Sequence, residues 1–143
     1  MCTVRQMNNV ALIRVPSVTF SSKTVHGQTI YRGVDEFTQK VSQRIRSQLL
    51  AIGVGCSPIQ RSFKPIGSGF MATSPSGDYF MTVCIEPEAL PCAEITICAD
   101  ACGGAVRSWD WFEPLFRRAV ESEFSALPKW MTIDEYVESG SSL

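Results

Sequence analysis

Two stretches of alternating side chains, at residues 79–86 and 93–98, bring together residue types that can exchange protons. Successive side chains of a strand point to opposite faces, so every second residue of each stretch shares one face. If the two strands pair antiparallel through residues 87–92, their polar faces coincide in one surface with two thiols and two carboxylates. That surface would comprise Thr82, Cys84, Glu86, Glu94, Thr96 and Cys98. A slip of one residue would abolish it; the alternative interpretation is an ordinary antiparallel sheet with one solvated face.

The six cysteines suggest a second kind of chemistry, metal binding, which we test against known spacings. They are Cys2, Cys56, Cys84, Cys92, Cys98 and Cys102. A zinc site built from Cys92, Cys98 and Cys102 would need spacings of six and four, without any CxxC pair and with His26 as the only histidine. Structural zinc sites usually use tighter pairs, so we expect no metal. His26 stands beside Gly27, and we expect it to be a surface residue rather than a catalytic base.

The surrounding sequence predicts the elements that would position these groups. Apolar residues recur at steps of three and four over residues 34–52, which predicts a helix that stops at Gly53. A second helix should follow a cap at Asp110, and a short helix is expected at residues 131–137. Strands are predicted at residues 9–20, 67–73, 79–86 and 93–98, with a loop at 21–33. This order predicts an α/β chain of the α+β kind, a two-layer sandwich whose mainly antiparallel sheet carries its helices on one face.

Length and composition place the chain among compact globular proteins. The 143 residues suit one domain, which we place at residues 1–135, followed by a flexible C-terminal tail at 136–143. Hydrophobic residues make up 45% and charged residues 19%, which favours a folded core. The formal net charge of −1 argues against a nucleic-acid partner. No apolar run is long enough for a membrane span, and residues 1–9 are polar, so we expect a cytoplasmic protein without disulfides.

Three segments give the chain a resemblance to a known family. They read RSFKPIGSGF at residues 61–70, GDYFMTVCIEPE at 77–88 and AEITICAD at 93–100. In order and spacing they are similar to the S-adenosylmethionine decarboxylases, and the resemblance covers roughly residues 34–124. The positions that carry it are Phe63, Pro65, Gly67, Thr82, Pro87, Glu88 and Cys98.

The resemblance implies a fold, a ligand and a set of roles. Members of the family decarboxylate S-adenosylmethionine for spermidine synthesis with a pyruvoyl group, made by cutting their own chain before a serine, that serves as the electron sink. Their small bacterial members are sheet-and-helix sandwiches that dimerise. By this resemblance Phe63 stacks on adenine, Glu88 holds the ribose hydroxyls and Cys98 donates a proton.

The chain departs from the family pattern where the cofactor is made. A glutamate–serine step should precede the strand of Thr82, but the sequence there is Gly77-Asp78-Tyr79. The processing histidine is replaced by Cys84, which could relay a proton only if its pKa were lowered. We therefore expect no cofactor, unless Ser74 or Ser76 in the neighbouring turn is processed to a pyruvoyl group.

These observations leave three hypotheses for function. The first is a catalytically degenerate homologue that binds S-adenosylmethionine or a related nucleoside through Phe63 and Glu88, or regulates a partner such as a catalytic paralogue. The second is an active decarboxylase of spermidine biosynthesis with atypical self-processing. The third is a protein-interaction domain without a small ligand. The sheet face without helices must meet either solvent or a second sheet, and since small bacterial members of the family dimerise, the resemblance implies a symmetric homodimer.

Overall fold

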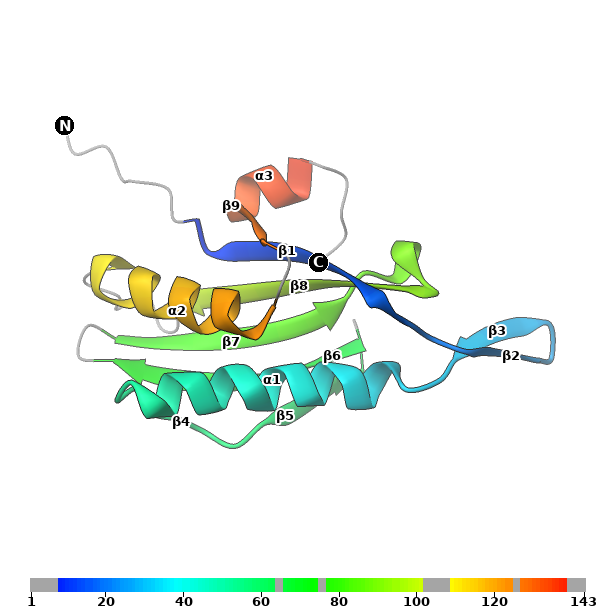
Figure 1. The fold of residues 1–143 in the computed structure, drawn as a ribbon, viewed down its shortest axis with the longest axis horizontal. Helices are drawn as coiled ribbons and strands as arrows, with labels where there is room; N and C mark the ends of the chain where they lie inside the picture. Colours follow the sequence, from blue (N-terminus) through cyan, green and yellow to red (C-terminus); the bar gives the residue numbers. More distant parts are fainter. Residues whose placement is uncertain (1–7, 64–65, 75–76, 102–108, 125–126, 139–143) are drawn as a thin grey trace.

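The computed structural model describes residues 8–63, 66–74, 77–101, 109–124 and 127–138. Its main sheet has the strand order β4-β6-β7-β8-β1-β9, and β5 also pairs with β6 (Figure 1). All of these pairs are antiparallel. The strands are β1 Val10–Thr19, β4 Gly55–Cys56, β5 Gln60–Phe63, β6 Ile66–Ser74, β7 Gly77–Ile85, β8 Cys92–Ala101 and β9 Lys129–Met131.

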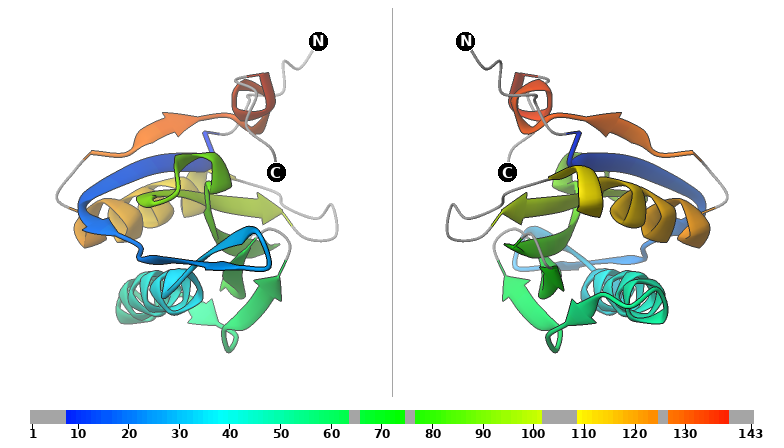
Figure 2. Two further views of the ribbon diagram at one scale, coloured as in Figure 1. Left: turned by 90° about the vertical axis from the view of Figure 1, so that its right-hand side faces the viewer. Right: turned by 90° about the vertical axis from the view of Figure 1, so that its left-hand side faces the viewer.

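Two helices, α1 (Val34–Ala51) and α2 (Trp109–Glu123), cover one face of this sheet. Figure 2 shows them side by side on the same side of the strands. The core lies between the layers: Ile45 of α1, Phe112 of α2 and Tyr79 of β7 are each fully buried. The rings of Tyr79 and Phe112 stack with centroids 4.3 Å apart. The predicted fold class, α+β with a mainly antiparallel sheet, is confirmed at this level.

The first helix forms where the apolar spacing predicts it, and glycines mark both of its ends. Gly33 precedes α1 with φ 81°, and Gly53 follows it with φ 91°, a left-handed conformation that glycine adopts at little cost. On the buried side, Ser42 and Ser68 share a hydrogen bond of 2.5 Å. Ser68 also donates to the carbonyl of Thr38 at 3.0 Å, so the polar groups between α1 and β6 are satisfied.

The stretch predicted as a loop at residues 21–33 is instead a β-hairpin. Strands β2 (Ser22–Val25) and β3 (Gln28–Tyr31) pair antiparallel in a sheet of their own. The turn between them uses positive φ at both central residues, 50° at His26 and 77° at Gly27, which fits the twist of a two-residue hairpin. The sequence does not predict it because its strands are only four residues long and Val25, Ile30 and Tyr31 are their only apolar residues.

The C-terminal part differs from the prediction in two ways. The short helix predicted at 131–137 is present as α3 at Ile133–Glu138, but it is preceded by a strand, β9, that was not predicted. Thr132 caps this helix as expected: its hydroxyl accepts from the backbone N–H of Glu135 at 3.1 Å. Tyr136 is buried, so the packed part of the chain extends at least to Glu138 rather than ending at residue 135.

The position of α3 also corrects the expectation that all helices lie on one face. Tyr136 donates its hydroxyl proton to Glu86, whose side chain shares a face with Thr96, opposite to the face under α1 and α2. Figure 2 shows α3 apart from the other two helices, beyond β1 and β9. The helix therefore covers part of the second face and leaves the part over β6 and β7 without a helix.

Candidate functional site

The register of β7 against β8 confirms that the two polar faces coincide. Thr82 lies opposite Cys98, and Cys84 lies opposite Thr96. One step further along, the backbone N–H of Glu86 donates to the carbonyl of Glu94 at 2.8 Å. Residues in the alternate positions, including Val83, are buried toward the helices. We call the surface that carries these polar residues, together with the matching residues of β6, the second face.

Glu86 is the most enclosed charged residue of the second face, with 9% of its surface exposed. Its carboxylate accepts short hydrogen bonds from the hydroxyls of Thr96 and Tyr136. The hydroxyls of Thr96 and Tyr136 are themselves 3.3 Å apart. A carboxylate withdrawn from water needs hydrogen-bond donors, and both of these hydroxyls donate to its Oε1. The cluster therefore fastens α3 to the sheet.

Tyr136 is the residue of this cluster that the sequence does not single out, although it lies within the helix predicted at 131–137. A signal for it exists in the sequence. Thr132 and Glu135 form a capping box, in which the backbone N–H of Thr132 also donates to Glu135 at 3.3 Å. A helix that starts at Ile133 places Ile133 and Tyr136 three residues apart on one side, where they can contact the sheet.

Cys98 and Cys84 both lie on the second face, and both thiols are held in the neutral form. Cys98 packs against Val10, Met131 and Tyr136 with 4% of its surface exposed. Burial raises its pKa far above the ordinary value, and the Asp100 charge, a hydrogen bond to Asp100 and Cys84 act in the same direction. For Cys84, burial is the larger cause that raises the pKa, and Glu86 adds to it. The lowered pKa that a relay through Cys84 would require is therefore not found.

We expect Cys98 to resist alkylation in the folded protein. Because its pKa is raised, the reactive thiolate remains scarce even when the pH is increased from 7 to 9, and the buried sulfur is also inaccessible. Cys92 is exposed and serves as the internal reference. Iodoacetamide labelling followed by peptide mass spectrometry should show Cys98 reacting roughly a hundredfold or more slowly than Cys92 across this pH range. Comparable rates would contradict the burial of Cys98.

Gly67 and Gly69 complete the second face on strand β6. Gly67 lies opposite Cys84, and Gly69 lies opposite Thr82. A Cβ at Gly67 would lie 2.5 Å from the carbonyl oxygen of Val83 and 2.9 Å from the sulfur of Cys84. These contacts are shorter than van der Waals distances, so the two strands can approach as they do only because position 67 has no side chain.

The residues expected to contact substrate lie at one end of the sheet. Phe63 ends β5, where it pairs with Ile66; the described structure gives its backbone and not its side chain. Glu88 lies in a 3-10 turn, Pro87–Ala89, directly after β7, and is exposed. Since Ile66 directly precedes Gly67, the partner of Cys84, both residues belong to the end where β7 finishes.

The segment that corresponds to the family's processing site lies at the opposite end. Ser74 pairs with Gly77, so β6 and β7 form a closed hairpin with a two-residue connection. Gly77 and Ile85, the two ends of the nine-residue strand β7, are about 27 Å apart at strand spacing. One copy of the chain therefore does not bring Phe63 or Glu88 near residues 77–79. Ser76 lies outside the described residues, and the side chain of Ser74 is likewise not described.

Two of the three cysteines considered as ligands of a zinc ion lie within the described residues. Cys92 is exposed and Cys98 is buried, whereas Cys102 falls outside the described ranges. In the part of the chain that the structure describes, no group of three or more His, Cys, Asp or Glu residues is arranged to hold a metal ion. His26 occupies the exposed turn between β2 and β3, far from the second face (Figure 1).

A cavity of about 390 Å³ lies on the helix side of the molecule, away from the second face. It is lined by Gln43, Arg44, Ser47, Gln48, Ala51 and Glu123. The amide of Gln48 donates to the carboxylate of Glu123 at 3.2 Å across it. Its position between α1 and the end of α2 separates it from every residue singled out by the sequence analysis.

The fold and the second face define a broad class: a two-layer α+β protein with an antiparallel sheet and a partly covered polar face. No family model, curated protein or solved structure matches the chain. Among the described residues, none of the helices has the length and apolar character needed to cross a membrane.

Proposed function

We propose that the chain is a catalytically degenerate relative of the S-adenosylmethionine decarboxylases that binds S-adenosylmethionine or a related nucleoside without consuming it. The observation that carries this proposal is the sequence of the β6–β7 hairpin, where Ser74 pairs with Gly77 and no glutamate–serine step precedes the strand of Thr82. In the enzymes that the sequence resembles, this is where the chain is cut to make the pyruvoyl group. Without that group there is no electron sink for the carboxylate's electrons, so binding is not followed by decarboxylation.

The two groups proposed to contact the ligand are compatible with their positions in the fold. Glu88 is exposed in the turn after β7, where its two carboxylate oxygens can accept from a ribose diol. Phe63 stands two strands away, at the end of β5, which corresponds to about 10 Å at the usual strand separation. That span matches a nucleoside that stacks its base on one group and offers its sugar to the other.

The states of the cysteines support binding over catalysis. Cys98, the proposed proton donor of the family, is buried beneath Tyr136 and Met131, and Cys84 is neutral as well. The second hypothesis, an active decarboxylase processed at Ser74 or Ser76, would require cleavage without the glutamate–serine step of the family. A cytoplasmic location is part of the proposal, because Cys56, Cys84, Cys92 and Cys98 are free thiols, as a reducing compartment would keep them.

Calorimetric titration with S-adenosylmethionine, its decarboxylated form and methylthioadenosine tests this proposal. Stacking of a base on an aromatic ring contributes about 1–3 kcal/mol, so Phe63→Ala should weaken binding about tenfold or more. Glu88→Gln should weaken binding of nucleosides with an intact ribose more than binding of their 2′-deoxy analogues, because only the intact diol engages both oxygens. Glu138→Gln, which removes an exposed charge from α3, is the matched control and should bind normally.

The same samples should show that the chain is uncut. Denaturing mass spectrometry should give one species of 15.8 kDa. Two fragments that sum to this mass, one of them with a borohydride-reducible carbonyl, would replace the proposal by the active-enzyme hypothesis. If none of the three ligands binds below millimolar concentration, or if Phe63→Ala leaves binding unchanged, the interaction-domain hypothesis takes its place.

A further inference from the structure

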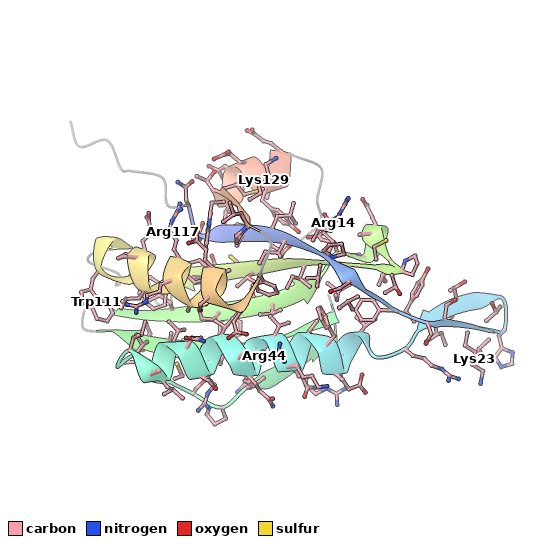
Figure 3. All side chains as sticks on the ribbon, in the orientation of Figure 1. Arg14, Lys23, Arg44, Trp111, Arg117 and Lys129 are labelled. Carbon is pink, nitrogen blue, oxygen red and sulfur yellow. The ribbon has the colours of Figure 1, made fainter. Side chains whose placement is uncertain are left out.

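The β2–β3 hairpin forms an arm that projects from the molecule. Its strands pair only with each other, as a separate two-stranded sheet. Most of its side chains are exposed, and Ile30 keeps 50% of its surface in solvent. Figure 1 shows the arm extending past the end of the main sheet, and Figure 3 shows Lys23 on it. An isolated two-stranded ribbon is marginally stable in water, so a surface that packs against the arm would stabilise it.

The arm is basic. Residues 21–33 contain Lys23, Arg32 and His26 and no aspartate or glutamate. Lys23 and Arg32 are both exposed. Among the described residues the ion pairs join Arg14 to Glu94, Arg61 to Asp35 and Arg117 to Glu113, and the two arm cations take no part in them. The arm therefore presents two exposed cations next to an exposed apolar side chain.

The second face has the opposite charge. Strands β6, β7 and β8 contain Asp78, Glu94 and Asp100 and no lysine or arginine. Asp78 and Asp100 are exposed, and they lie together near the β6–β7 connection, since Asp78 pairs with Thr73 and Asp100 with Phe80. Beside them lie two half-buried apolar residues, Phe80 of β7 and Met71 of β6, which pair with each other across the two strands. This acidic end thus combines carboxylates with apolar surface, as the complement of the arm.

The arm cannot reach the acidic end of its own molecule. Its base is fixed near the start of β8, because the backbone N–H of Phe20 donates to the carbonyl of Pro91 at 2.9 Å and Thr19 pairs with Cys92. Asp100 lies eight residues further along β8, about 27 Å away at strand spacing. The four-residue strands of the arm span only about 14 Å. The complementary charges must therefore meet between molecules.

We propose that the arm of one copy docks on the acidic end of the second face of another copy, with Lys23 and Arg32 opposite Asp78 and Asp100. The basic and acidic regions stand at opposite ends of the sheet, so a two-fold axis brings each arm to the partner's acidic end and makes every contact twice. Ile30 lies over the apolar side chains of β6 and β7, the part of the second face that α3 leaves uncovered. This pairing does not depend on the proposed nucleoside.

Sedimentation equilibrium at micromolar protein tests the pairing. The wild-type chain should be dimeric, and Lys23→Glu/Arg32→Glu should weaken the dimer about tenfold or more, because the two-fold axis doubles the number of repulsive contacts. Asp78→Lys/Asp100→Lys should weaken it similarly, and the four changes together should restore it. Lys40→Glu/Arg44→Glu makes the same charge change on the exposed side of α1 and should leave the dimer intact.

Other outcomes would overturn the proposal. They are a wild-type monomer, equal effects of the arm and α1 variants, or a charge swap that fails to restore association. Since Asp100 also bonds Cys98, Asp78→Lys alone and Asp78→Asn/Asp100→Asn show whether any loss reflects misfolding, with circular dichroism as the check. A labelled DNA duplex that binds the monomer and is released by Lys23→Glu/Arg32→Glu would assign the arm to nucleic acid instead.

Discussion

Replacing Gly67 by alanine should lower the free energy of unfolding by about 3 kcal/mol, at the upper end of the range for overpacking. The added Cβ would lie 2.5 Å from the carbonyl oxygen of Val83 and 3.2 Å from the Cα of Cys84. Both atoms belong to the backbone of β7, so the clash can be relieved only by separating β6 from β7 at the centre of the sheet. Thermal unfolding followed by circular dichroism should show a midpoint about 10 °C lower.

Gly55→Ala is the matched control for this prediction. Gly55 also lies in a strand that pairs with β6, but a Cβ there would meet Thr73 at 3.7 Å, an ordinary contact. Neither glycine has a positive φ, so the comparison isolates the effect of space from that of backbone conformation. The control should unfold within about 0.5 kcal/mol of the wild type. Equal stabilities of the two variants would mean that β6 and β7 do not approach as closely as described.

Replacing Tyr136 by alanine should cost about 3–5 kcal/mol, the range for removing a large buried aromatic side chain. The ring is 1% exposed and packs with Val10, Cys98 and Met131. Its loss also removes one of the donors to the buried carboxylate of Glu86. Both effects act on the second face, so α3 should detach and Cys98 should become accessible to iodoacetamide. Urea unfolding and the labelling rate of Cys98 measure the two consequences.

Two further variants separate the contributions of the ring and the hydroxyl. Tyr136→Phe keeps the ring, and Thr96 still donates to Glu86, so this variant should lose about 1–3 kcal/mol. Val137→Ala changes the neighbouring residue, which is 53% exposed, and should have little effect. If Tyr136→Ala matches Val137→Ala in stability while Cys98 stays unreactive, the cluster of Glu86, Thr96 and Tyr136 does not hold α3.

Variants at Gly67 and at Tyr136 also test the proposed function, because the two residues lie in different parts of the sheet. Gly67 lies in the F-x-P-x-G motif close to Phe63, whereas Tyr136 lies over β8 and β1. A nucleoside held at the end of β7 should therefore still bind the Tyr136→Phe protein. Because Tyr136→Phe leaves the strand register intact, a change in ligand affinity in that variant would indicate that the ligand sits on the second face rather than at its end.

Much of the fold was accessible from local patterns. The steps of three and four over residues 34–52 predict α1 because one helical turn brings such residues to the same side. The alternation in 79–86 and 93–98 predicts which side chains share a face, since the period of a strand is two. Turn residues between 74 and 78 predict the hairpin of β6 and β7 and hence the register that places Gly69 opposite Thr82. The hairpin of the arm was not predicted because its two strands have only four residues each, too few for a recognisable alternation.

The sequence by itself thus determined α1 and the central strands, the polar composition of the second face and the separation of the basic segment 21–33 from the acidic strands. Only the tertiary structure decided what covers that face. Tyr136 follows Glu86 by 50 residues in the chain. It donates a hydrogen bond to Glu86 and packs against Cys98, so that Glu86 is paired and Cys98 is buried. Local periodicity reports which side of an element is apolar, whereas burial and pKa depend on segments that meet only when the chain has folded.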